Sequence, residues 1–316
     1  MSQTAWVLIF PDSKIEWATL IVILLQTTAH IYLYRCRHKI QLLLKKLLKI
    51  SEMCSIHSWK TLETAVTVYC IFSSSVIFAC LVIYYNIDLT KYYHFLVNNS
   101  TSIPEDLKYY VNIIRDITYL LNILSMEGFL LSINLYYCFV CWCVKLFALK
   151  LIPKSQATTV QNDCNRVLQI YQELNNAVKY ADSFLSYPAF ISVVTNMCEL
   201  FWTGYNFVFL FDGDYLLFTS LALFLIHDLI ILLLIVLSGA AANSAIMMAR
   251  STIKSLPAQF PQLYQKIKMV VRQRCKQKNS FTLWKIYTFD KPLLINALGT
   301  LLTYGILLGT LGSVRN

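Results

Sequence analysis

The sequence has little charge, and its charges are mostly of one sign. Only 14% of the 316 residues are charged, whereas a soluble domain carries about 25%. The 17 aspartates and glutamates are outnumbered by 27 lysines and arginines. The chain contains neither an internal repeat nor a low-complexity linker, which excludes a repeat solenoid. This composition argues against a soluble globular protein.

The sequence also lacks the motifs of common enzymes. None of the patterns H-E-x-x-H, G-x-S-x-G, Walker A and G-x-G-x-x-G occurs, and each of these patterns places catalytic or phosphate-binding groups. Ten cysteines are present. The C-x-x-C pair Cys138 and Cys141 lies in an apolar run, where packing is favoured over redox or metal chemistry. We expect no enzyme, no cofactor, no metal site and no structural disulfide.

Long apolar runs dominate the chain instead. Hydrophobic residues make up 57% of the sequence, and the mean hydropathy is +0.54. A helix of about 20 apolar residues crosses the hydrocarbon core of a bilayer, which is about 30 Å thick. We therefore predict an all-α membrane protein with six visible spans, at residues 15–34, 64–85, 117–148, 189–211, 215–237 and 293–311.

Basic residues lie mainly on one side of these spans. The lysines and arginines number seven in residues 35–63, ten in 250–291, one in 1–14, three in 86–116 and none in 212–214. Such an excess marks cytoplasmic segments. The first residues, the 86–116 loop and the C-terminus are therefore predicted to lie outside. The 86–116 loop contains two overlapping N-x-S/T sequons, so Asn98 and Asn99 are candidates for glycosylation.

The predicted inner segments are long, polar and helix-forming. Residues 40–63 form an amphipathic basic pattern, which we expect to lie along the inner leaflet. Residues 156–186 are a second helical segment, with Pro188 between it and the next span, and residues 250–285 are strongly basic. Anionic lipid attracts such charges by about 1 kcal/mol each near the surface. Membrane lipid, rather than nucleic acid, therefore explains the net charge of +10.

Three acidic residues lie inside predicted spans: Glu127, Glu199 and Asp228. A charge in the middle of a bilayer costs at least about 2.5 kcal/mol, so such residues usually face a cavity, a pathway or a partner. One interpretation is a ligand cavity or an ion path among the spans. The other is hydrogen bonding between helices that holds their packing.

Aromatic residues gather toward the outer half of the predicted bilayer. Trp202 and Tyr205 are three residues apart, and Glu199 precedes Trp202 by three, so the three share one helix face. Together with Glu127 and Phe129 they are candidates for an outward-facing pocket that takes a small organic ligand. The alternative is an aromatic belt at the level of the lipid headgroups.

The last predicted span carries a motif. Thr303-Tyr304 is followed by five residues and then by Thr310-Leu311, and Phe289-Asp290-x-x-Leu293-Leu294 precedes them. This stretch resembles the C-terminal signature of the insect gustatory receptors, a family of the seven-transmembrane chemosensory receptor superfamily. The family signature is Thr-Tyr, five apolar residues and Gln-Phe, so Gln-Phe is replaced here. Long inner helices and an outside C-terminus match the family's inverted topology, in which the first of seven helices has no counterpart here.

The resemblance implies a ligand-gated, non-selective cation channel of the plasma membrane, formed as a tetramer alone or with other gustatory receptors and opened by a tastant. Residues 1–249 would form the ligand-binding bundle, and residues 250–316 the cytoplasmic anchor helix and the pore helix. Apolar side chains of that helix would close the pore by dewetting. The candidates for pore and gate are Thr303, Tyr304, Leu307, Leu308, Thr310 and Leu311.

Alternative functions remain at this point. The replaced Gln-Phe pair favours an accessory or nonfunctional receptor subunit. A G-protein-coupled receptor would have seven spans and an inside C-terminus, which the span count and the charge pattern oppose. A transporter would have internal repeats and matched broken helices, which the sequence does not contain.

Overall fold

The computed structural model describes residues 13–54, 105–156, 161–209, 215–275 and 279–290, together with single positions within 64–75 and 292–303. Within these ranges, the side chains of residues 13–23, 118–127, 202 and 205–209 are among those outside the description.

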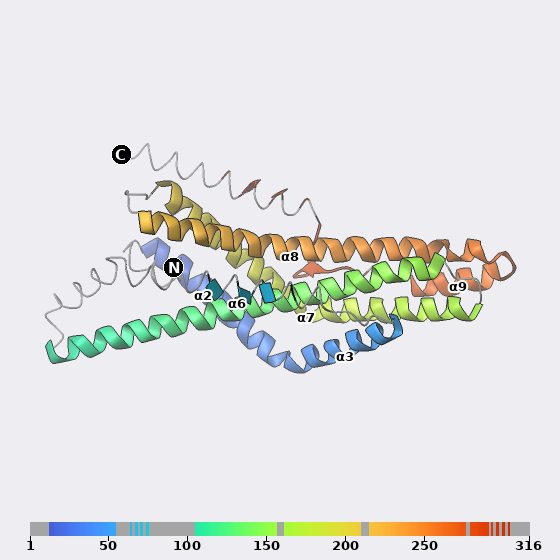
Figure 1. Ribbon diagram of the computed structural model, residues 1–316, viewed down its shortest axis with the longest axis horizontal. Coiled ribbons are helices and arrows are strands. Elements are labelled where there is room, and N and C mark those ends of the chain that lie inside the picture. Colours follow the sequence, from blue (N-terminus) through green and yellow to red (C-terminus); the bar gives the residue numbers. More distant parts are fainter. Residues whose placement is uncertain are drawn as a thin grey trace.

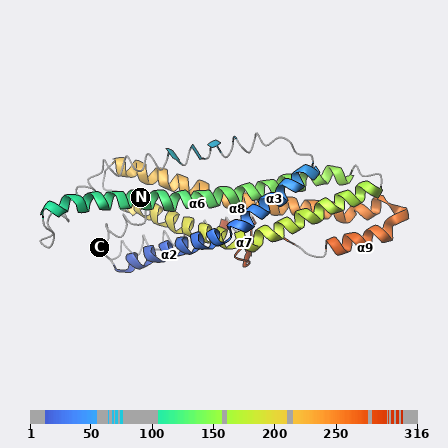
Figure 2. The same ribbon diagram turned by 90° about the horizontal axis from the view of Figure 1, so that it is seen from below.

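Three long helices form the body of the structure. They are α6, Glu105–Gln156, with 52 residues; α7, Gln161–Phe209, with 49; and α8, Tyr215–Ser255, with 41. They lie side by side along the long axis of the molecule (Figures 1 and 2). At 1.5 Å per residue each is about 60 Å long or more, roughly twice the thickness of a hydrocarbon core. Each helix therefore combines a membrane span with an extension beyond the bilayer.

The proline in α7 does not end the helix. The prediction that Pro188 separates an inner helix from a span is wrong, because α7 is continuous through this residue. Proline removes one helical hydrogen bond and normally kinks or breaks a helix. Here the helix is buried on both sides of the proline, with Phe184, Leu185, Ala189 and Ile191 at most 2% exposed. Packing against the neighbouring helices compensates for the lost bond.

Two shorter helices lie against this body. α2, Ser13–Arg35, covers the first predicted span, and a turn at Cys36 leads into α3, Arg37–Cys54. The apolar residues Leu43, Leu47 and Ile50 of α3 are at most 3% exposed, and α3 packs against α7 and α6 (Figure 1). The expectation that this apolar face lies on lipid is wrong, because the extensions of α6 and α7 cover it.

The basic segment after α8 is only partly helical. It contains the 3₁₀ turns Leu256–Gln259 and Pro261–Leu263, the short helix α9, Tyr264–Arg274, and the strands β1, Thr282–Leu283, and β2, Tyr287–Thr288. The strands pair antiparallel as a hairpin, with Thr282 opposite Thr288 and Leu283 opposite Tyr287. In the described part of the predicted anchor segment, α-helix is thus limited to the end of α8 and to α9.

Candidate membrane spans overlap the predicted ones. In the part of the chain that the structure describes, three helical stretches are long and apolar enough to cross a membrane: Gly128–Ser155, Asp163–Phe201 and Leu221–Gln259. They correspond to the third, fourth and fifth predicted spans. The described positions of the second and sixth predicted spans are helical as well. The all-α class is confirmed, with the small hairpin as its exception.

Candidate functional site

Two contacts between side chains set the register of the long helices. Ser192 of α7 donates a hydrogen bond of 2.5 Å to Asn134 Oδ1 of α6. Ser238 of α8 donates to the Cys138 sulfur of α6 at 3.4 Å. The chain folds back from α6 to α7 and again from α7 to α8, so α6 and α8 run in the same direction (Figure 1). Cys138 lies four residues further along α6 than Asn134, so the second contact lies about 6 Å further inward than the first.

This register brings the three predicted acidic residues to one depth. Glu127 and Glu199 each lie seven residues outward from the contact between α6 and α7. Asp228 lies ten residues outward from the contact between α6 and α8, and so about six residues outward from the level of Asn134. These offsets correspond to about 10 Å along the helices. Asp228 is 6% exposed, and its Oδ1 lies 3.2 Å from Nδ1 of His227. The side chain of Glu199 is half-buried, and that of Glu127 is outside the description.

A buried polar cluster lies just inward of the acidic residues, between α6 and α7. Asn196 Nδ2 donates to the Ser192 carbonyl oxygen at 2.7 Å, and Ser192 bonds Asn134. Asn134 Nδ2 and Thr195 Oγ1 are buried and have no hydrogen-bond partner among the described atoms. A buried donor without a partner costs about 1–3 kcal/mol. Two polar atoms of the cluster are thus left without a hydrogen bond among the described residues.

The predicted aromatic residues of the pocket are only partly placed. Phe129 stacks on His30 of α2, with ring centroids 4.0 Å apart and an interplanar angle of 10°. Phe129 is therefore a contact between α2 and α6. Trp202 and Tyr205 lie on α7 as expected, but their side chains are outside the described residues.

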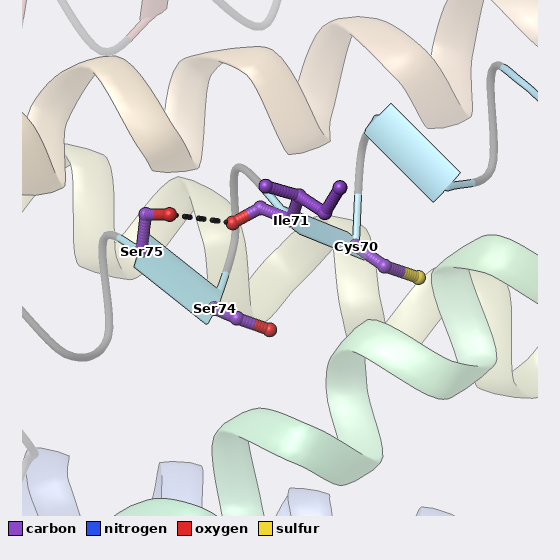
Figure 3. A pocket seen from close by; sticks show the side chains of 4 residues that line it. All are labelled: Cys70, Ile71, Ser74 and Ser75. Atoms are coloured by element: carbon purple, nitrogen blue, oxygen red, sulfur yellow. Dashed lines mark hydrogen bonds between the residues drawn. The ribbon is translucent and has the colours of Figure 1, made fainter.

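An open hollow lies on the second predicted span (Figure 3). It has a volume of about 450 Å³ and is lined by Cys70, Ile71, Ser74 and Ser75. The Ser75 hydroxyl donates to the Ile71 carbonyl oxygen at 2.8 Å, so it is satisfied within its own helix. A ligand pocket usually buries most of its ligand between several elements. These four residues come from one helix and do not form such an enclosure.

The most completely bonded polar site holds the β1–β2 hairpin against α8. Asn243 of α8 is 6% exposed and makes three hydrogen bonds to the backbone. Its Nδ2 donates to the carbonyl oxygens of Phe281 and Phe289, at 3.0 Å each. Its Oδ1 accepts from the Phe281 N–H at 2.7 Å. One amide side chain thus binds both ends of the hairpin.

The helix α7 holds the other side of the hairpin. Asp182 accepts from the Thr282 N–H at 2.7 Å, and the Thr282 hydroxyl donates to the same carboxylate, 2.9 Å from Oδ1 and 3.1 Å from Oδ2. The Trp284 N–H donates to the Ser186 carbonyl oxygen at 3.0 Å. The hairpin is therefore bonded to α7 and α8 at the same time.

Aromatic packing completes the docking of the hairpin. Phe281 and Phe289 are at most 2% exposed, and both rings contact Tyr137 of α6, with centroid distances of 6.0 Å and 5.4 Å. Phe289 lies directly on Gly239 of α8. A Cβ at Gly239 would lie 2.7 Å from Cγ of Phe289, so only glycine allows this approach.

The turn of the hairpin has an unusual backbone. Trp284 and Lys285 have φ angles of 46° and 59°, and the Ile286 N–H donates to the Leu283 carbonyl oxygen at 2.9 Å. Two central residues with positive φ are typical of a type I′ turn, which asparagine and glycine favour. For residues with a Cβ this conformation costs roughly 1–2 kcal/mol each. The hydrogen bonds to α7 and α8 hold the turn in this conformation.

We expect the bond between Thr282 and Asp182 to be measurable in the stability of the protein. In Thr282→Val the hydroxyl is lost while the shape and the backbone N–H are kept, so the carboxylate loses one donor. The expected loss is about 1–2 kcal/mol, seen as a lower melting temperature in detergent micelles. Thr288→Val is the matched control, because Thr288 is the exposed partner of Thr282 across the hairpin. An equal loss in both variants would contradict the role of Asp182.

The candidates for pore and glycosylation mostly lie outside the described residues. Thr303 is helical and exposed, and its hydroxyl donates to the Gly299 carbonyl oxygen at 2.8 Å, within its own helix. The residues outside the description are Tyr304, Leu307, Leu308, Thr310, Leu311, Asn98 and Asn99. Their roles stay predictions.

Comparison with known proteins gives a match by structure. By sequence, the chain matches no protein-family model and no curated protein. By structure, it matches the insect olfactory receptor OR5 from Machilis hrabei in complex with eugenol, with a TM-score of 0.52 and 14% identity over 95% of this chain and 91% of that chain. A second structure of OR5 matches with a TM-score of 0.50 and 12% identity over 94% and 89%. The fold is that of an insect chemoreceptor.

This match shows a shared fold, which agrees with the predicted architecture. It agrees with the expectation that the chain is not an enzyme, since the matched protein is a receptor. It covers nearly the whole of both chains, so the likeness extends along the length of the fold. Membership of the chemosensory receptor superfamily, and of the gustatory family within it, stays a prediction.

Proposed function

We propose that the chain is a subunit of a ligand-gated cation channel in the plasma membrane, a chemoreceptor that a small organic molecule opens. The observation that carries the proposal is the chemoreceptor fold along 95% of the chain. The C-terminal motif that resembles gustatory receptors supports a taste receptor, formed as a tetramer alone or with related chains. One matched structure contains eugenol, which supports a ligand of similar size.

The geometry suggests how ligand binding reaches the last span. Glu199 and Asp228 lie in the outer half of α7 and α8, and the same two helices hold the hairpin further inward through Asp182 and Asn243. The hairpin ends at Phe289, and the last span starts a few residues later. A ligand that prefers one arrangement of α7 and α8 shifts the equilibrium between two states by its difference in affinity. The hairpin transmits that shift to the last span.

The proposal is tested by recording membrane currents from cells that express the chain alone or with a second gustatory receptor. Sugars, bitter compounds and phenols such as eugenol are applied, and surface expression is measured in parallel. A cation current evoked by one of these classes is the expected result. Current only in the presence of the second receptor would identify an accessory subunit. If no class evokes current in either arrangement despite surface expression, the channel function is wrong.

Glu199 is expected to contribute to the response. In Glu199→Gln the shape is kept and the charge is removed. The ligand concentration that gives half of the maximal current should therefore change about tenfold, because a hydrogen bond to a charged group contributes about 1.5 kcal/mol or more. Glu173→Gln is the matched control on the same helix, because Glu173 pairs with Lys49 in the inner extension at 3.2 Å. An unchanged response in Glu199→Gln would remove this residue from the pocket.

A further inference from the structure

The tip of the β1–β2 hairpin exposes large side chains next to the membrane. Trp284 is 51% exposed, Ile286 62% and Tyr287 60%. Lys285, between Trp284 and Ile286, is exposed as well. These four residues, 284–287, are called the hairpin tip. The rest of the hairpin is docked on α7 and α8, so the tip is held in a fixed position.

Two independent features place the hairpin tip at the inner surface of the bilayer. The Trp284 ring packs against Tyr187 and Phe190 of α7, at centroid distances of 5.9 Å and 5.1 Å. These residues mark the point where the polar inner part of the sequence gives way to the apolar fourth span. The last span follows the tip in sequence, starting near Pro292. Both features indicate the same boundary.

We propose that the hairpin tip is an interfacial membrane anchor that binds phospholipid of the inner leaflet. Trp284, Ile286 and Tyr287 lie among the glycerol groups and the upper acyl chains, and Lys285 bonds the phosphate of an anionic headgroup. Tryptophan and tyrosine are enriched at this level of membranes because one part of the ring is apolar and another is polar. A lysine beside them extends toward the headgroups. The proposal rests on the membrane topology and is independent of channel activity.

The chemistry of the tip favours lipid over a second copy of the chain. Four residues are far fewer than the roughly 20–30 residues a side of a stable protein interface. The surrounding inner segments are basic, with ten lysines and arginines in residues 250–291. An anionic leaflet attracts such charges. The positive φ angles of Trp284 and Lys285 are a further sign of function, because asparagine and glycine would form the same turn without strain.

The test uses the full chain in lipid nanodiscs and the fluorescence of Trp284. Emission is compared between the parent and Trp284→Phe, in lipid with bromine on the upper acyl chains and in the same lipid without bromine. Bromine quenches only tryptophan that touches the lipid. The emission of the parent minus that of Trp284→Phe is the emission of Trp284. We expect brominated lipid to quench most of this difference. A difference emission that bromine leaves unchanged would overturn the proposal, whether Trp284 faces water or another protein.

Two further variants separate the roles of the tip and of the fold. The double variant Trp284→Asn, Lys285→Gly has the residues that the turn prefers, so it keeps the hairpin. Like Trp284→Phe, it should lack the part of the parent's emission that brominated lipid quenches. For the headgroup, Lys285→Gln should retain less phosphatidylserine after purification, measured by native mass spectrometry. Lys266→Gln on the exposed face of α9 is the control. Equal retention in both lysine variants would overturn the assignment of Lys285 to a lipid phosphate.

Discussion

Replacing Asn243 with leucine is expected to release the hairpin from α8 and to cause one of the largest losses of stability of any single substitution in the chain. Leucine has the same branched shape and the same number of side-chain heavy atoms, so the change removes the three hydrogen bonds without opening a cavity. The Phe281 N–H and the Phe289 carbonyl oxygen then stay buried without a partner, whereas the Phe281 carbonyl oxygen still accepts from the Phe289 N–H at 3.3 Å. Each of the two orphaned groups costs about 1–3 kcal/mol, so the total is about 2 kcal/mol or more.

The loss is measured as a lower melting temperature in detergent and as faster hydrogen exchange at residues 281–290. The matched control is Ser244→Leu, because Ser244 is the next residue on α8, is also polar and is exposed. On the proposed function, Asn243→Leu also reduces the evoked current at equal surface expression, since the hairpin no longer follows α7 and α8. Normal stability and exchange in Asn243→Leu would show that the hairpin is held by aromatic packing and by its bonds to α7, without a contribution from Asn243.

The spans were predictable because they depend on length and hydrophobicity alone. A run of about 20 uncharged residues has no alternative in a membrane except a helix, and α8 begins at Tyr215 as the fifth run does. The inner extensions were harder. The basic pattern of α3 fits lipid and protein equally well, and only the packing of Leu43 and Leu47 against α6 and α7 decides between them.

The hairpin could not be predicted from the sequence. Its strands have only two residues each, too few for an alternating pattern. Its turn consists of Trp284 and Lys285, which are unfavourable at positive φ. The partner that holds it, Asn243, lies in a run of small residues on α8, about 40 residues earlier in the chain. Local propensity carries no information about a side chain whose partners are backbone groups so distant in sequence.

The candidate site was likewise predictable from the sequence only in part. The sequence identified Glu127, Glu199 and Asp228 one by one, because charges inside spans are costly. Their common depth depends on the register of the long helices, which the contacts of Asn134 and Ser238 reveal. The buried residues Asn134 and Ser192 could have been noticed as polar residues within apolar runs. Uncharged polar residues are common in spans, however, and their partners appear only once the helices are packed.

The close contact between Gly239 and Phe289 leads to the second large prediction. In Gly239→Ala the new Cβ would lie 2.7 Å from Cγ of Phe289 and 3.0 Å from its Cβ and Cδ1. Phe289 is 2% exposed and contacts Tyr137, so its ring has no space into which to move. Overpacking of this kind costs about 1–3 kcal/mol, against a gain of about 1 kcal/mol for replacing a helical glycine with alanine. We expect a lower melting temperature and a hairpin displaced from α8.

Gly128 of α6 gives the matched control for this substitution. No described atom lies within 4 Å of a Cβ at Gly128, so Gly128→Ala should keep or raise the melting temperature through helix propensity alone. The double variant Gly239→Ala, Phe289→Leu tests the mechanism, because the smaller leucine relieves the clash. It should be more stable than the sum of the two single changes, with a coupling of about 0.5–3 kcal/mol. Strictly additive losses would mean that Gly239 is needed for a reason other than its contact with Phe289.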